Sequence, residues 1–151
     1  MPVSIATPVL ANGLLPMFIP ATAPETTAKA ADAWAKAYVG YAVAGGVVAA
    51  NTRRLSLAQA LTAAFRPELA GGGQALFMAA LAAFWIGMPI PAQLGAAVVF
   101  APTNPSVNSP QDPSATPQQQ ANGLARVIAG LTLGAVKVQL ATPPNPIVPL
   151  V

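Results

Sequence analysis

Hydrophobic positions recur at three- and four-residue spacing in four stretches of the chain, and this spacing predicts four α-helices. In the first stretch, Trp34, Tyr38 and Tyr41 fall on one stripe of the helix. The opposite stripe carries four charged residues of alternating sign, which are Glu25, Lys29, Asp32 and Lys36. This pattern is typical of an amphipathic helix with one buried and one solvated face.

Capping sequences and helix breakers set the expected bounds of these helices. Three helices are preceded by a capping-box spacing, in which Thr or Ser is followed three residues later by Glu or Gln. These spacings are Thr22 to Glu25, Ser56 to Gln59 and Thr116 to Gln119. We expect the four helices to end at or before breakers, which are Gly45-Gly46, Pro67, Pro89 and Gly130 with Gly134.

Residues 1–21 contain four prolines and many apolar side chains. Because proline interrupts regular helices, we expect this segment to be an extended arm or a short hairpin. Its apolar side chains would then need a partner surface. The residues predicted to lie at such an interface are Val3, Ile5, Leu14, Leu15 and Phe18.

The spacing of apolar residues changes near the C-terminal end of the sequence. Between Val136 and Leu140 apolar and polar residues alternate, which predicts a half-buried strand. Residues 93–100 are a second candidate strand. The proline-rich residues 141–151 are expected to form an extended tail that docks on a neighbour through Ile147, Val148 and Leu150.

The predicted fold is therefore mainly α, a small bundle of about four helices with an extended N-terminal arm, a C-terminal strand and a proline-rich tail. The helical domain would span residues 22–140, with the arm at 1–21 and the tail at 141–151. Residues 101–117 are polar and rich in proline, so an exposed loop is expected there.

Composition adds a question about the surroundings of this domain. Charged residues make up only 7% of the chain and hydrophobic residues 54%, with a mean hydropathy of +0.57. The apolar surface would have to be covered by a membrane or by neighbouring proteins. The longest uninterrupted apolar helix, at 74–88, is shorter than the roughly 20 residues that a bilayer requires. The pattern favours a soluble assembly; a membrane-associated protein with a re-entrant segment at 74–100 is the alternative.

The chain contains neither cysteine nor histidine, the side chains most used for nucleophilic and metal chemistry near neutral pH. Its four carboxylates are Glu25, Asp32, Glu68 and Asp112. Capping, surface pairing or turn formation accounts for each of them more simply than a paired-carboxylate site. We therefore expect a non-catalytic protein with no cofactor, no metal and no small-molecule substrate.

Arg53 and Arg54 form the main local cluster of positive charge. They could contact the backbone of a nucleic acid, in which case binding would weaken steeply with salt. The sequence favours a different role, in which they stabilise the negative C-terminal end of the first predicted helix.

Three segments of the chain resemble small alanine-rich virion proteins of tailed bacteriophages. They are residues 34–41, residues 83–89 and the closing strand at 136–140. The resemblance implies a structural role in the virion, above all as a head-tail connector or neck ring subunit that docks through extended termini. A capsid decoration protein or a tail or baseplate protein is the alternative within this class. Copies of the chain and adjacent virion proteins would be its partners, and the virion its location.

Overall fold

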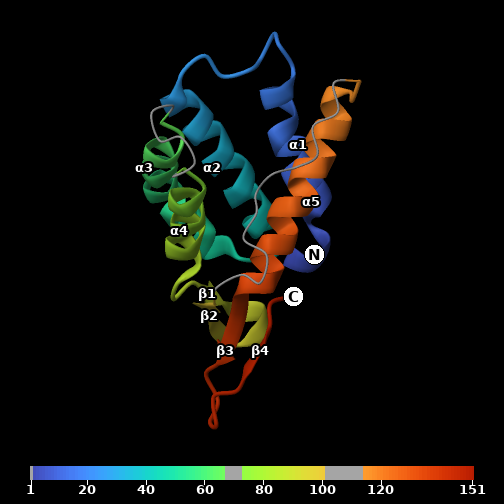
Figure 1. Ribbon diagram of the computed structural model, residues 1–151. Helices are drawn as coiled ribbons and strands as arrows, with labels where there is room; N and C mark the ends of the chain where they lie inside the picture. Colours follow the sequence, from blue (N-terminus) through green and yellow to red (C-terminus); the bar gives the residue numbers. More distant parts are fainter. Residues whose placement is uncertain (1, 67–72, 101–113) are drawn as a thin grey trace.

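The computed structural model describes residues 2–66, 73–100 and 114–151. Within these residues, five α-helices stand on a four-stranded antiparallel sheet at one end of the molecule (Figure 1). The helices are α1 (Thr7–Leu14), α2 (Thr27–Ala44), α3 (Arg54–Ala64), α4 (Gly73–Trp85) and α5 (Pro117–Ala135). The strands are β1 (Pro89–Ile90), β2 (Gly95–Val99), β3 (Val136–Leu140) and β4 (Ile147–Pro149). The prediction of a mainly α protein with a C-terminal strand is confirmed.

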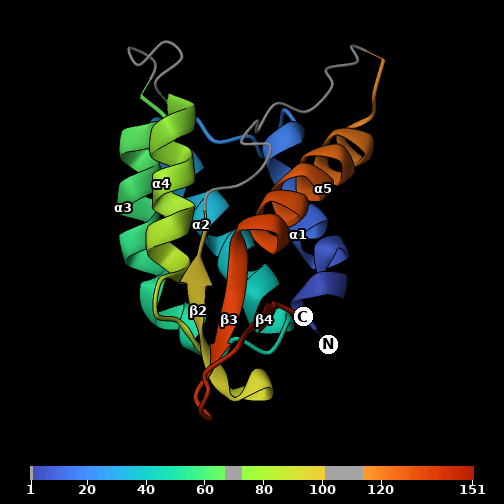
Figure 2. The same ribbon diagram turned by 60° about the horizontal axis from the view of Figure 1, so that its bottom comes forward.

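Helix α2 is the centre of the bundle. It packs against α1 and α3, while α4 packs on α3 and α5 packs on α1 (Figure 2). Its buried face includes small side chains such as Ala31, Ala35 and Ala42, which allow neighbouring helices to approach closely. Much of the hydrophobic composition is thus alanine within the protein's own core.

The predicted extended N-terminal arm is wrong, because residues 7–14 form α1. Short 3-10 helices precede and follow it, at Val3–Ile5 and Leu15–Phe18. Pro8 and Pro16 lie in the first turns of their helices, where a backbone N–H has no intrahelical partner and its loss costs little. The prolines therefore mark the beginnings of helices here.

Two of the three predicted caps are also wrong. Helix α2 begins at Thr27, and Thr26 is its cap, because its hydroxyl accepts a hydrogen bond from the Lys29 N–H at 3.2 Å. Thr22 donates instead to the Pro16 carbonyl at 2.7 Å. Ser56 lies inside α3, which begins at Arg54 because the connector at Val48–Arg53 is already a 3-10 helix.

Helix α5 confirms the third cap. Thr116 and Gln119 make both hydrogen bonds of the capping box. The helix then continues past Gly130 and Gly134 to Ala135, beyond its predicted end. A glycine costs a helix only about 1 kcal/mol, which is less than burial of the apolar side chains of α5 against the bundle contributes.

Strand β3 follows α5 directly, and the predicted strand at 136–140 is confirmed. The second candidate strand is also present, as β2 at Gly95–Val99. The order in the sheet is β1-β2-β3-β4, with Ala97 opposite Val138 and Val138 opposite Val148. Of the loop predicted at 101–117, residues 101–113 lie outside the described residues, and Pro117 already belongs to α5.

In the part of the chain that the structure describes, no helix combines the length and the apolar character needed to cross a bilayer.

Candidate functional site

Most of the residues predicted to lie at an interface are covered by the protein's own chain. Val3, Leu14 and Leu150 are buried in the core. Three others, Leu15, Phe18 and Val148, are partly buried and pack against it. Only two of the eight remain largely exposed: Ile5, at 61%, and Ile147, at 52%. A single chain therefore covers six of these eight residues wholly or partly, although both of its ends were expected to need a partner.

The side chain of Gln93 makes two hydrogen bonds with the end of the tail. The Gln93 amide nitrogen donates to the Pro149 carbonyl at 2.8 Å, and its amide oxygen accepts from the Val151 N–H at 3.0 Å. Gln93 thus occupies backbone hydrogen-bonding groups next to β4 that another strand would otherwise pair with. The tail was predicted to dock on a neighbour, but residues 147–149 form a strand of the protein's own sheet.

The two arginines serve separate contacts within the fold. Arg53 Nη1 donates to the carbonyl oxygens of Phe84 and Ile86 at 2.8 and 2.6 Å. These carbonyls lie at the C-terminal end of α4, so Arg53 stabilises that helix end, and not the end of the first predicted helix. Arg54 pairs with Asp32 at 3.3 Å.

One face of the sheet is only partly covered by the described residues, because its side chains are half-buried or exposed. The register places seven side chains on it, here called the outer sheet face: Pro89, Ala96, Val98, Lys137, Gln139, Ile147 and Pro149. In a sheet packed on one side, the other side is usually polar. Here five of the seven are apolar or proline, and Lys137 is the single charged residue. A shallow hollow runs along this face as far as Ile86.

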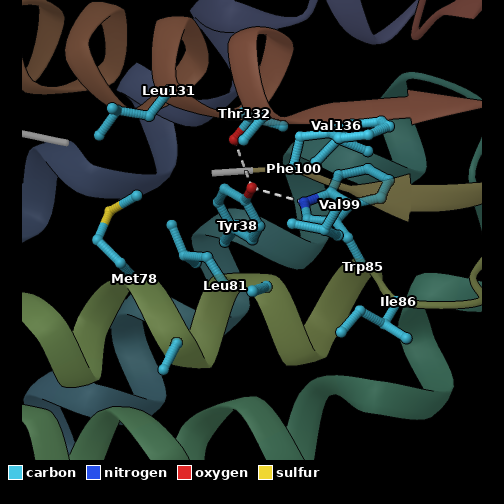
Figure 3. A pocket seen from close by; sticks show the side chains of 13 residues that line it. Tyr38, Met78, Leu81, Trp85, Ile86, Val99, Phe100, Leu131, Thr132 and Val136 are labelled. Atoms are coloured by element: carbon cyan, nitrogen blue, oxygen red, sulfur yellow. Dashed lines mark hydrogen bonds between the residues drawn. The ribbon is translucent and has the colours of Figure 1, made fainter. Parts of the chain in front are cut away.

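The opposite side of the same sheet adjoins a cavity of about 350 Å³ between α4 and α5, here called the Tyr38 cavity (Figure 3). Its lining side chains are apolar apart from a cluster of polar atoms on Tyr38, Trp85 and Thr132. The lining residues are Tyr38, Met78, Ala79, Leu81, Ala82, Trp85, Ile86, Val99, Phe100, Leu131, Thr132, Ala135 and Val136.

The polar cluster is a continuous chain of hydrogen bonds. Trp85 Nε1 lies 2.7 Å from the Tyr38 hydroxyl, which lies 2.5 Å from the Thr132 hydroxyl. Thr132 in turn lies 3.0 Å from the Ile128 carbonyl, one turn back along α5. Three elements that are distant in sequence are therefore joined at a buried point.

A second tyrosine on α2 has a contrasting environment. The Tyr41 hydroxyl is buried and has no hydrogen-bond partner among the described residues. Burial raises the pKa of Tyr38 to about 12, although its hydrogen bonds with Thr132 and Trp85 act in the opposite direction. Burial also raises the pKa of Tyr41, and the neighbouring Tyr38 adds to that increase.

Sequence reasoning missed both of these sites. It placed Tyr38 and Tyr41 on the buried stripe, which is correct, but it assigned Tyr38 no polar partner. One signal was available, since Thr132 is a polar residue on the otherwise apolar stripe of α5. The outer sheet face could not be recognised before the pairing of the four strands was known.

No protein-family model, no curated protein and no solved structure matches this chain.

Proposed function

We propose that this protein is a non-catalytic assembly subunit whose outer sheet face binds a neighbouring copy of the chain. The observation that carries the proposal is the apolar character of that face. Val98, Ile147 and Pro149 lie where a solvated sheet would carry polar side chains. The apolar residues lie on both sides of Gln139 and Lys137, which the middle strand β3 contributes. Exposed apolar surface marks interaction sites in soluble proteins.

The charge on this face favours a head-to-tail contact. Lys137 is its single charged residue, and none of its seven side chains is a carboxylate. Pairing two such faces about a two-fold axis would place two lysines in one apolar contact, and like charges brought together oppose binding. Binding to a different patch of the next copy avoids this cost and generates a ring or an open filament.

A ring agrees with the role that the resemblance to tailed-phage virion proteins implies. We propose the head-tail connector, or neck, of a virion as the setting, with copies of the chain and adjacent virion proteins as partners. Capsid decoration or a position in the tail or baseplate would use the same surface in a different layer of the particle.

A single substitution on this face tests the proposal. Ile147→Glu would place a charge within the contact, while Leu55→Glu is the matched control at an exposed leucine on α3. Sedimentation velocity over a range of concentrations should show oligomers for the unchanged protein and for Leu55→Glu. Ile147→Glu should sediment as a 15.1 kDa monomer. Circular dichroism should show the same helicity for all three.

Two results would overturn this function. The unchanged protein could remain a monomer at every concentration, or Ile147→Glu could assemble as the unchanged protein does. Truncation of the tail is a poorer test, because residues 147–149 belong to the sheet and Leu150 to the core.

A further inference from the structure

We propose that the Tyr38 cavity binds a neutral, largely apolar molecule that carries a hydroxyl or N–H group as a hydrogen-bond donor. This would be a binding function separate from assembly through the outer sheet face. The inference rests on the size of the cavity, the chemistry of its walls and the direction of the hydrogen bonds at Tyr38.

Size and wall chemistry indicate the body of the ligand. The cavity holds about 350 Å³, which is at the lower end of the roughly 300–1,000 Å³ typical of small-molecule sites. Apolar side chains such as Met78, Leu81 and Leu131 surround it. None of the described residues that line it is charged, so a charged ligand would lose its hydration without compensation from them.

The hydrogen-bond chain has only one direction in which every bond has a hydrogen. The Trp85 indole N–H can only donate, so Tyr38 accepts from it at 2.7 Å. The Thr132 hydroxyl hydrogen is directed to the Ile128 carbonyl at 3.0 Å. The remaining bond, 2.5 Å between Tyr38 and Thr132, therefore uses the Tyr38 hydrogen.

This direction decides what the site can offer a ligand. Trp85, Tyr38 and Thr132 have each committed their one polar hydrogen, so the cluster has no donor left. A hydroxyl oxygen can accept more than one hydrogen bond, and among the described residues the Tyr38 oxygen accepts from Trp85 alone. A ligand hydroxyl or N–H can donate to this oxygen, whereas a ligand ether or carbonyl finds no partner.

A matched pair of probes tests this preference. 2-Naphthol and 2-methoxynaphthalene share an aromatic body, but only the first can donate a hydrogen bond. Displacement of the fluorescent probe N-phenyl-1-naphthylamine at neutral pH gives both affinities. We expect 2-naphthol to bind roughly three- to tenfold more tightly, which is the ordinary worth of one hydrogen bond.

Thr132→Val provides the decisive variant. It keeps the shape of the side chain but removes the acceptor of the Tyr38 hydrogen, so Tyr38 becomes a free donor. The preference for 2-naphthol should then disappear or reverse in favour of 2-methoxynaphthalene. Thr62→Val is the matched control, because Thr62 makes the same bond to a carbonyl one turn back, 2.8 Å from Ala58, but does not line the cavity. It should leave the ratio unchanged.

Further outcomes locate the binding. Ala82→Leu narrows the cavity and should weaken both probes. The proposal would be overturned by failure of both probes to bind, by an unchanged ratio in Thr132→Val, or by full affinity in Ala82→Leu. Binding only after residues 101–113 are replaced by a glycine-serine linker would point to the chain's own segment as occupant, and would overturn it as well.

Discussion

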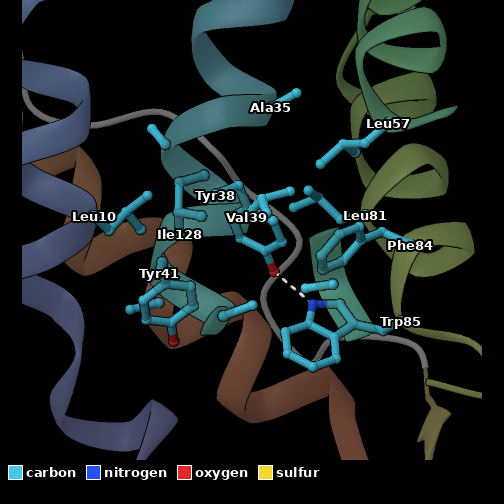
Figure 4. Packing of buried hydrophobic residues seen from close by; sticks show 14 of the residues in the cluster. Leu10, Ala35, Tyr38, Val39, Tyr41, Leu57, Leu81, Phe84, Trp85 and Ile128 are labelled. Carbon is cyan, nitrogen blue, oxygen red and sulfur yellow. Dashed lines mark hydrogen bonds between the residues drawn. The ribbon is translucent and has the colours of Figure 1, made fainter. Parts of the chain in front are cut away.

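Helix α2 packs on α1 on one side and faces the Tyr38 cavity on the other. On the side of α1, Val3 and Leu14 are fully buried. Leu10, which Figure 4 shows on α1, is fully buried as well. Toward α4 and the sheet, the described residues leave apolar surface partly uncovered, within the Tyr38 cavity and on the outer sheet face. The buried contacts on the α1 side contribute stability, although residues of α1 and α2 also line a pocket of about 440 Å³. The other side retains apolar surface that can bind.

The two tyrosines of α2 show the same difference at the level of single atoms. Tyr38 and Tyr41 are both buried and lie almost one turn apart. The Tyr38 hydroxyl has partners on α4 and α5, while the Tyr41 hydroxyl lacks one among the described residues. Removing the hydroxyl should therefore lower the free energy of unfolding at Tyr38 but not at Tyr41.

The largest effect is expected at the tight contact between Gly45 and Val3. A Cβ added at Gly45 would lie 2.7 Å from the Val3 backbone Cα, so Gly45→Ala should lower the free energy of unfolding by about 2–3 kcal/mol. At Gly40, which lies within α2 whereas Gly45 follows its last residue, an added Cβ meets nothing within 4 Å. Gly40→Ala should raise stability by about 0.5–1 kcal/mol. Urea unfolding measures the free energy of unfolding of both variants. Equal changes for the two substitutions would contradict the steric explanation.

The next effect concerns the hydrogen-bonded tyrosine. Tyr38→Phe leaves the buried Trp85 N–H without an acceptor and removes the hydrogen that Thr132 accepts. We expect a loss of about 1–3 kcal/mol in the free energy of unfolding. A urea midpoint equal to that of the unchanged protein would show that the hydrogen-bond chain does not stabilise the fold.

Alkaline pH should destabilise the protein through ionisation of Tyr38 and Tyr41. In the unfolded chain, tyrosine loses its proton near pH 10, whereas the folded state holds the pKa of Tyr38 at about 12. The contribution of Tyr38 to the free energy of unfolding is therefore fully present below pH 10. It decreases between pH 10 and 12 by about 1.4 kcal/mol per pH unit. Burial of Tyr41 acts with the same sign.

Tyrosinate absorbance provides the measurement, because the chain has only two tyrosines. It should stay flat through pH 10 and then rise together with the loss of helicity. A titration near pH 10 with helicity intact would mean that at least one tyrosine is accessible to water.

The smallest effect belongs to Tyr41. Tyr41→Phe removes a buried hydroxyl that lacks a partner among the described residues, so stability should be unchanged or rise by up to about 1 kcal/mol. A loss comparable to that of Tyr38→Phe would show that the Tyr41 hydroxyl has a partner in solution and would end the contrast between the two tyrosines.

Periodicity predicted the elements whose own residues determine them. Helices α2, α4 and α5 and strand β3 follow from the spacing of their apolar residues. Helix α1 was missed because proline was treated as a barrier, although a first-turn proline such as Pro8 is compatible with a helix. The partners of Tyr38 were beyond prediction, since Trp85 and Thr132 are 47 and 94 residues away.

Protection of the outer sheet face from a thiol-alkylating reagent, measured as the protein assembles, tests the proposed function most directly. Because the chain has no cysteine, Ala96→Cys introduces one thiol on that face, and Leu55→Cys introduces one on α3 as a control. The rate of alkylation by iodoacetamide is measured as protein concentration rises. We predict that alkylation slows several-fold for Ala96→Cys and stays constant for Leu55→Cys. An unchanged rate for Ala96→Cys at concentrations where the protein is oligomeric would contradict assembly through this face.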